Sequence, residues 1–149
     1  MPRQLAAGFF IVRRLGIIGK SFGAVKAFAF ANELQLFCLG LFSPATYFFE
    51  RGNLNVTLSK KYCDITKLSD LVLPNSYIQN IKTPVLIIHG NQDTTIPFSN
   101  SQSMMDLLRT EKKELFVVEG ADHSMKEVKY SDLAFNKMAE FFKEVYSRK

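Results

Sequence analysis

Short, nearly continuous apolar segments restrict the folds open to this chain. Three of them, each ended by turn-forming or polar residues, cover Leu15–Gly19, Leu34–Ser43 and Pro84–Gly90, and a shorter strand is expected over Glu114–Glu119. Continuous rather than alternating hydrophobicity is typical of strands in a parallel sheet that is covered on both faces. The segments therefore predict a buried parallel sheet.

Segments with helical features alternate with these strands. The residues after Ser21 are rich in Ala and Phe, and later helices are expected over Asn100–Arg109 and Asp132–Tyr146. This alternation predicts an α/β fold with right-handed crossovers. In such a fold ligands bind at the carboxyl ends of the strands, where Ser21, Asp93 and His123 are expected to lie.

Capping residues and apolar spacing predict the finer limits of the helices. Ser99 or Ser101 is a candidate N-cap of the second helix, and Ser131 of the third. The expected buried positions are Met104, Leu107 and Leu108 in the second helix, and Leu133, Met138, Phe141, Phe142 and Val145 in the third. Residues 45–80 are expected to form a loop with one or two short helices, and residues 1–14 fit either a helix or an extended segment.

Length and composition fit one globular domain over residues 1–149. The chain is 47% hydrophobic and 22% charged, which is enough to build a core. Its net charge of +5 comes from scattered basic pairs, and no nucleic-acid-binding module accompanies them, so no nucleic-acid partner is expected. The apolar run Leu5–Val12 is too short to span a bilayer, so we expect no stable membrane insertion.

The two cysteines, Cys38 and Cys63, have neither a metal-ligand nor a redox spacing. Free thiols are typical of a reducing compartment, so the expected location is the cytoplasm and no metal site is expected.

The first predicted strand leads into Gly19-Lys20-Ser21-Phe22-Gly23. A serine in such a strand-to-helix turn has an exposed hydroxyl, and small residues two positions before and after it allow the strand and the helix to approach. The backbone N–H of Phe22 would lie at a helix N-terminus, where a developing oxyanion is stabilised. A phosphate-binding loop would need a glycine at position 14, which is Arg14, so the nucleotide-binding alternative is disfavoured.

A serine nucleophile needs a base, and the chain has two histidines, His89 and His123. His89 ends an apolar strand, where a structural role is expected, whereas His123 lies in a polar loop after the last strand and is the better candidate base. Asp93, in a polar turn, and Asp122 are candidate carboxylates to orient the base. Asp122 is the poorer candidate because neighbouring side chains in an extended segment point in opposite directions.

The motifs Gly-Lys-Ser-Phe-Gly, His-Gly-Asn-Gln-Asp and Gly-Ala-Asp-His resemble those of the α/β-hydrolase family. Their order along the chain is that of the family, so the resemblance implies Ser21 as nucleophile, Asp93 as acid and His123 as base. The strand Pro84–Gly90 is similar to its counterpart in monoacylglycerol-lipase-like, serine-aminopeptidase-like and dienelactone-hydrolase-like enzymes. The resemblance covers roughly residues 15 to 146.

The resemblance implies a three-layer sandwich with a mostly parallel sheet. It also implies a serine hydrolase that cleaves an ester, thioester or amide through an acyl-enzyme intermediate, with Phe22 N–H in the oxyanion hole. No cofactor or metal is expected, and the expected ligand is a small-molecule ester or amide. Four apolar residues, Tyr47, Phe48, Ile96 and Met125, are candidate pocket walls, although ordinary packing explains them equally well.

The chain also departs from the family. Family members have about eight strands, and this chain has counterparts only of the last four, without the loop that supplies a second oxyanion donor. The alternative is therefore a truncated, non-catalytic remnant or a binding module. The strand Leu15–Gly19 would lie at a sheet edge, and we expect residues 1–14, a second copy of the chain or a separate polypeptide to cover it.

Overall fold

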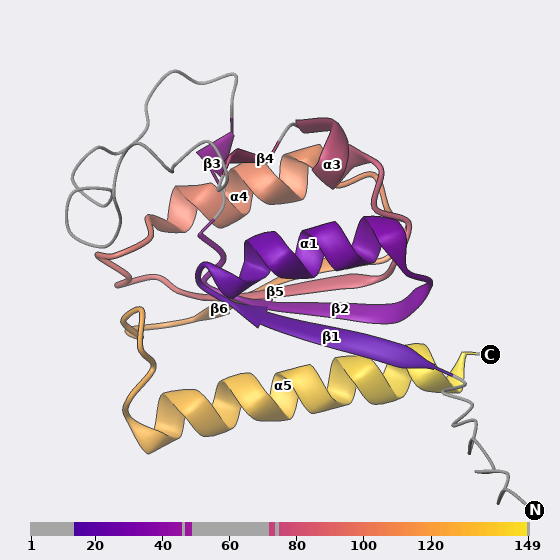
Figure 1. The fold of residues 1–149 in the computed structure, drawn as a ribbon. Coiled ribbons are helices and arrows are strands. Elements are labelled where there is room, and N and C mark those ends of the chain that lie inside the picture. The colour runs from indigo at the N-terminus through magenta and orange to yellow at the C-terminus, as the bar shows by residue number, and fades with distance from the viewer. Residues whose placement is uncertain (1–13, 46, 49–71, 74, 149) are drawn as a thin grey trace, which may run out of the picture.

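A computed structural model describes residues 14–45, 47–48, 72–73 and 75–148. The elements follow the order β1 (Leu15–Lys20), α1 (Gly23–Glu33), β2 (Leu36–Phe42), β3 (Tyr47–Phe48), β4 (Val72–Leu73), α3 (Asn75–Gln79), β5 (Val85–Gly90), α4 (Phe98–Leu107), β6 (Lys113–Val118) and α5 (Val128–Ser147) (Figure 1). The expectations for residues 1–13 and for Cys63 lie outside the described residues.

The main sheet has four strands in the order β1-β2-β5-β6, and every neighbouring pair is parallel. All six residues of β5 are buried, as expected for a central strand with helices on both faces. The predicted parallel α/β sheet is confirmed. The connector differs from expectation, because β3 and β4 form a small parallel pair. Two residues in each strand are too few to produce a recognisable period.

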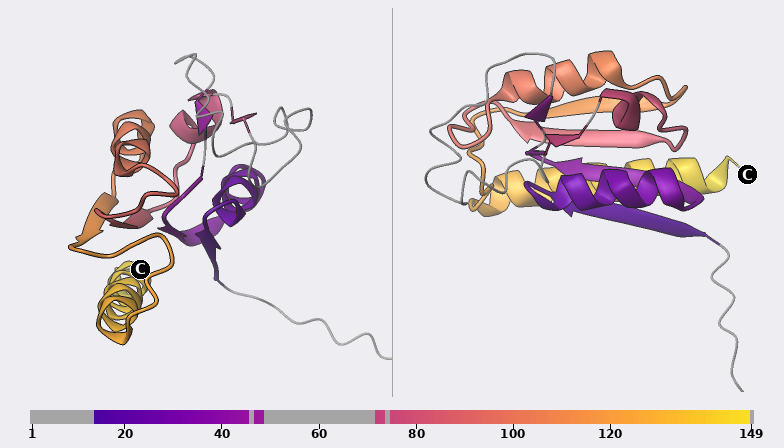
Figure 2. Two further views of the ribbon diagram at one scale, coloured as in Figure 1. Left: turned by 90° about the vertical axis from the view of Figure 1, so that its left-hand side faces the viewer. Right: turned by 45° about the horizontal axis from the view of Figure 1, so that its top comes forward.

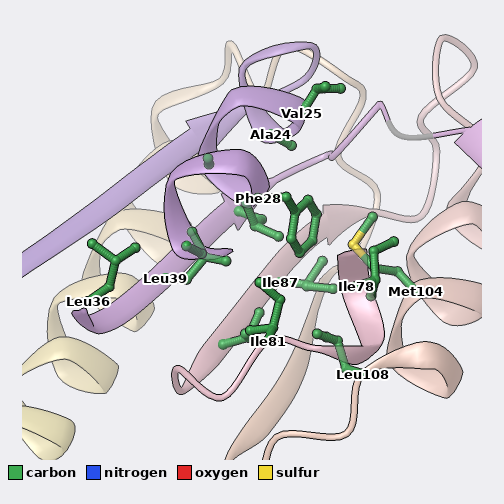
Figure 3. Close-up of a cluster of buried hydrophobic side chains, with 14 residues drawn as sticks. Ala24, Val25, Phe28, Leu36, Leu39, Ile78, Ile81, Ile87, Met104 and Leu108 are labelled. Carbon is green, nitrogen blue, oxygen red and sulfur yellow. The ribbon is translucent and has the colours of Figure 1, made fainter. Parts of the chain in front are cut away.

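Helices cover both faces of the main sheet and give three layers (Figure 2). On one face, α1, α3 and α4 surround a cluster that includes Phe28, Leu39, Ile78, Ile87 and Met104 (Figure 3). On the other face, α5 packs against β2, β5 and β6 through a second cluster, which includes Cys38, Leu86, Ile88, Met138 and Phe141. The sandwich implied by the family resemblance is therefore present.

Helix α5 starts at Val128, four residues before the predicted start, and Ser131 does not cap it. The Ser131 hydroxyl instead donates to the Val128 carbonyl oxygen at 3.0 Å, inside the first turn. The predicted burial of Leu133 is also wrong, since this side chain is 47% exposed and Ala134 is buried in its place. The buried stripe consists of Ala134, Met138, Phe141 and Val145, which follow the i, i+4, i+7 spacing of one helix face.

Helix α4 begins at Phe98, with Pro97 at its N-cap position and no side-chain cap. The predicted capping role of Ser99 or Ser101 is therefore wrong. Ser99 is exposed, whereas Ser101 is fully buried and turned toward the end of β5. A serine near a helix start is ambiguous in sequence, because its hydroxyl can bond within the helix or to another element.

Strand β1 forms one edge of the sheet, and no strand in the described residues pairs with its outer side. Ile18 of β1 is 53% exposed there, and Phe135 of α5 is 62% exposed.

Cys38 is a free, buried thiol. No helix within the described residues is long and apolar enough to cross a membrane.

Candidate active site

Ser21 directly follows β1 and has a left-handed backbone conformation, with φ of 52°. Its N–H donates to the Phe42 carbonyl oxygen at 2.9 Å, and its own carbonyl oxygen accepts from Ala45 N–H at 3.0 Å. These bonds to the last residue of β2 and to the segment after it stabilise a conformation that costs free energy for a residue with a Cβ atom. The tight turn holds the Ser21 side chain at the carboxyl edge of the sheet.

Gly19 makes the tight turn possible, as the motif predicts. A Cβ atom at Gly19 would lie 2.9 Å from the Ala27 Cβ and 2.9 Å from the Gly23 carbonyl oxygen. The same prediction for Gly23 is wrong. A Cβ atom there would meet no described atom within 4 Å, because Gly23 is exposed at the start of α1. Of the two glycines, only Gly19 is needed for the close approach of β1 and α1.

Asp93 lies in the turn that follows β5, and all of its carboxylate oxygens are engaged. Oδ1 accepts the backbone N–H groups of Thr95 at 2.9 Å and Ile96 at 2.7 Å. Oδ2 accepts from the Nδ1 of His123 at 2.7 Å. The residue is 7% exposed, so the carboxylate is held in a fixed orientation and largely away from water.

His123 lies in the loop after β6 and connects the other two predicted residues. Its Nδ1 is bonded to Asp93 Oδ2, and its Nε2 lies 3.1 Å from Ser21 Oγ. The carboxylate accepts only, so Nδ1 carries a proton, and the neutral ring accepts the Ser21 hydroxyl proton at Nε2. The structure thus brings Ser21, His123 and Asp93 together from three strand ends in one hydrogen-bonded chain.

The hydrogen bonds around Asp93 determine its pKa. Burial raises the pKa of this carboxyl, but hydrogen bonds from His123, His89 and the Ile96 N–H outweigh it and hold the pKa well below its usual range. The carboxylate is therefore ionised at neutral pH. An ionised acceptor at Nδ1 stabilises a positive charge on the His123 ring.

Gly90 and Asn91, which sequence reasoning did not single out, link the end of β5 to the loop that holds His123. A Cβ atom at Gly90 would overlap the Ala121 carbonyl oxygen and lie 2.9 Å from the Ala121 Cβ. Asn91 Oδ1 accepts from Gly120 N–H at 2.7 Å, and its amide group donates to Glu119. A glycine at the end of a strand was the available signal, because it often marks a close backbone approach.

The remaining candidate residues take structural positions. The Asp122 carboxylate makes no hydrogen bond to the His123 ring, and its Oδ1 accepts from the backbone N–H of Ser124 at 3.0 Å and of Met125 at 2.7 Å. Ile96 and Met125 are buried in hydrophobic clusters, which fits ordinary packing, and the side chains of Tyr47 and Phe48 lie outside the description.

The Phe22 N–H belongs to the turn between Ser21 and α1. No described residue accepts a hydrogen bond from it. No cluster of three or more His, Cys, Asp or Glu side chains suited to a metal ion occurs in the part of the chain that the structure describes. The groups that the structure brings together at the site are the Ser21 hydroxyl, the His123 imidazole and the Asp93 carboxylate.

Comparison with known proteins agrees with this geometry. The sequence profile of the prolyl oligopeptidase family, Peptidase_S9, matches residues 3–149. The chain belongs to the prolyl oligopeptidase family. Among related sequences, the uncharacterized protein YfhR of Salmonella typhi is 25% identical over an alignment of 149 positions, which covers 91% of this chain and 49% of YfhR.

Several solved α/β-hydrolases share the fold of this family member. The meta-cleavage product hydrolase CumD of Pseudomonas fluorescens superimposes with a TM-score of 0.70 at 17% identity, covering 89% of this chain and 66% of CumD. For the esterase Pf2001 of Pyrococcus furiosus the TM-score is 0.68 at 23% identity, with coverage of 89% and 54%. For a monoacylglycerol lipase of Paleococcus ferrophilus it is 0.62 at 15% identity, with coverage of 86% and 68%.

These comparisons also show that the match is partial. The chain spans about half the length of YfhR and 54% of the length of the Pf2001 esterase. The described sheet thus corresponds to part of an α/β-hydrolase fold, in agreement with the four strands expected from the sequence.

Proposed function

We propose that this chain is a serine hydrolase that cleaves a carboxylic ester, thioester or amide, with Ser21, His123 and Asp93 as its catalytic triad. One observation carries the proposal: Ser21 Oγ, His123 and the Asp93 carboxylate form a continuous hydrogen-bonded chain, with distances of 3.1 Å and 2.7 Å. The left-handed backbone of Ser21 and the family match support the same assignment.

In the proposed reaction, Ser21 Oγ attacks the carbonyl carbon while its proton moves to His123 Nε2. The carbonyl oxygen becomes an oxyanion near the Phe22 N–H, and Asp93 stabilises the charged imidazole. Collapse of this intermediate breaks the bond to the leaving group, which takes the proton from His123 and leaves an acyl group on Ser21. Water, deprotonated by His123, then attacks the acyl carbon. Collapse of this second intermediate breaks the bond to Ser21 Oγ, which takes the proton back from His123, and the acid is released.

Reaction with a fluorophosphonate probe tests the proposal directly, because such a probe modifies an activated serine. We expect the wild-type chain to be labelled, and both Ser21→Ala and His123→Ala to lose labelling. Ser99→Ala, which removes an exposed hydroxyl at the start of α4, is the matched control and should label like wild type. A folded wild-type sample that fails to label would contradict the proposal.

The substrate panel follows from the names of the relatives. The solved structures include an esterase and a lipase, whereas the family is named for an oligopeptidase. We propose p-nitrophenyl esters of increasing acyl length as the first substrates and prolyl p-nitroanilides as the amide counterparts. Hydrolysis that depends on Ser21 in one of these series would identify the class of bond.

A non-catalytic role is the second candidate, and the partial match favours it. The chain covers 49% of YfhR, and the loop that the family resemblance implies for the second oxyanion donor has no counterpart among the described residues. Loss of one such donor costs on the order of a hundred- to a thousand-fold in rate. A non-catalytic chain would show no Ser21-dependent labelling, even at high probe concentration and long reaction times.

A further inference from the structure

A second histidine, His89, lies beside the same carboxylate oxygen of Asp93 as His123. His89 occupies the end of β5, is fully buried, and packs edge-on against the Phe98 ring. Its Nε2 lies 3.1 Å from Asp93 Oδ2 and 3.0 Å from the Ile96 carbonyl oxygen. The oxygen that bonds to the candidate base is thus shared by two imidazole rings.

The partners of His89 define its tautomer. Both atoms near Nε2 are acceptors, so Nε2 carries a hydrogen. In the neutral ring Nδ1 is then an acceptor, and its neighbour at 2.6 Å is the hydroxyl oxygen of Ser101, which must donate. His123 has the opposite tautomer, with its hydrogen on Nδ1. A chain of polar contacts therefore runs Ser21, His123, Asp93, His89, Ser101, in which the His89 Nε2–H donates to the Ile96 carbonyl oxygen and also lies 3.1 Å from Asp93 Oδ2.

We propose that His89 and Ser101 are positioning residues for the triad. Ser101, from the buried side of α4, fixes the His89 ring so that its Nε2–H donates to the Ile96 carbonyl oxygen and lies beside Asp93 Oδ2 at 3.1 Å. His89 in turn holds that oxygen where it orients His123. The inference rests on the proposed function, since positioning has a kinetic consequence only if Ser21 reacts.

The arrangement of donors around Asp93 supports this role. The two backbone N–H groups hold Oδ1, and without His89 only the His123 ring would hold Oδ2. His123 is 19% exposed at its side chain and lies in a loop, whereas His89 is fully buried in a central strand. The fully buried His89 ring is therefore a fixed group beside the carboxylate oxygen that orients His123, and small displacements in such a chain have large effects on rate.

Nuclear magnetic resonance of the nitrogen-15-labelled histidine rings tests the geometry without any activity. The chain contains only two histidines, so two ring systems appear, and substitution of either residue assigns them. At about pH 8, above the ordinary range of imidazole protonation, we expect one ring with hydrogen on Nε2, assigned to His89, and one with hydrogen on Nδ1, assigned to His123. A His89 ring with hydrogen on Nδ1 would overturn the proposal.

A matched pair of variants tests the kinetic role. The amide of His89→Gln places a donor near the position of Nε2, whereas the shorter His89→Asn places its amide near Nδ1 and loses the donor to Asp93. We expect His89→Asn to lower the rate of fluorophosphonate labelling by roughly a hundred-fold and His89→Gln to recover most of that loss. Rates are expressed per folded molecule, with the folded fraction taken from circular dichroism.

The outcomes separate positioning from packing and from failure of the proposed function. A packing role alone would lower the melting temperature of both variants and leave their labelling rates per folded molecule equal to wild type, which would overturn the proposal. Ser101→Ala should shift the His89 nitrogen resonances and lower the maximal rate of labelling. The probe concentration that gives half of the maximal rate should stay the same. If wild type fails to label while the resonances show the expected tautomers, the hydrolase assignment fails and the positioning role falls with it, although the hydrogen-bond chain stands.

Discussion

Oδ2 of Asp93 lies 2.7 Å from Nδ1 of His123, and the pKa of this carboxyl is held well below its usual range. Because the native carboxylate binds a proton less readily than an unfolded one, the unfolded state binds more protons in acid. The free energy of unfolding is then largest above about pH 4, near the pKa of an unperturbed Asp. It falls as the pH decreases through the depressed native pKa.

We therefore expect Asp93→Asn to weaken the acid dependence of stability. Urea unfolding between about pH 3 and pH 7 measures it, and Asp106→Asn, which neutralises an exposed carboxylate on α4, is the control. The control should retain the wild-type slope in acid. An unchanged slope in Asp93→Asn would contradict the assignment of this carboxyl as the acid-sensitive group.

The two glycines around Ser21 should respond differently to alanine. Gly19→Ala forces a methyl group against the start of α1 and is expected to cost about 1–3 kcal/mol of stability. In Gly23→Ala the added methyl group contacts no described atom, so the free energy of unfolding should be unchanged or higher by up to about 1 kcal/mol. Thermal unfolding of both variants measures the difference, and equal destabilisation would mean that the turn is not packed as described.

Gly90→Ala tests the junction between β5 and the loop of His123. The added methyl group overlaps the Ala121 carbonyl oxygen, which is backbone and must move. We expect slower labelling of Ser21 by roughly a hundred-fold, because a displacement of about 1 Å suffices for such a loss. Gly23→Ala is the control, and a Gly90→Ala protein with the wild-type labelling rate would contradict the close approach.

The thiol of Cys38 should be unreactive in the native protein. Burial raises its pKa to about 12, and the residue is fully enclosed between the sheet and α5. In a Cys63→Ser variant, where Cys38 is the only thiol, Ellman's reagent at about pH 8 should react only after denaturant is added. Fast reaction under native conditions would show that this side of the sheet opens readily.

For the purified chain we propose that a second copy covers the edge of β1. The outer side of β1 lacks a strand partner among the described residues, and the exposed Ile18 adds apolar surface. Light scattering after gel filtration should show association that Ile18→Lys weakens. Phe30→Lys, which replaces an exposed apolar residue on α1, is the control and should associate like wild type. A monomeric wild type would contradict the proposal.

The sequence was sufficient to predict the parallel sheet and the grouping of Ser21, Asp93 and His123. A continuous apolar run such as Val85–Gly90 is compatible with few structures other than a buried strand, and each candidate residue lies in the turn or loop after a strand. The start of α5 at Val128 was not predictable in this way, because no capping side chain marks it.

Contacts between segments remote in sequence were harder to predict. The partner of Ser101 is His89, on another element, and the partner of Gly90 is the backbone of Ala121. Neither pairing leaves a local pattern in the residues around it. Such contacts depend on how β5, α4 and the loop after β6 pack, which only the three-dimensional structure contains.

The hydrogen bond between Ser21 and His123 joins residues 102 positions apart, and the bond between His123 and Asp93 spans 30 positions. Each residue is carried by a different strand, so none of these pairs exists until the sheet has assembled. If Ser21 reacts as proposed, a fluorophosphonate probe would consequently label only the molecules in a mixture whose sheet has assembled. In a screen of variants or solvent conditions, the fraction of labelled protein would then measure the fraction that is folded.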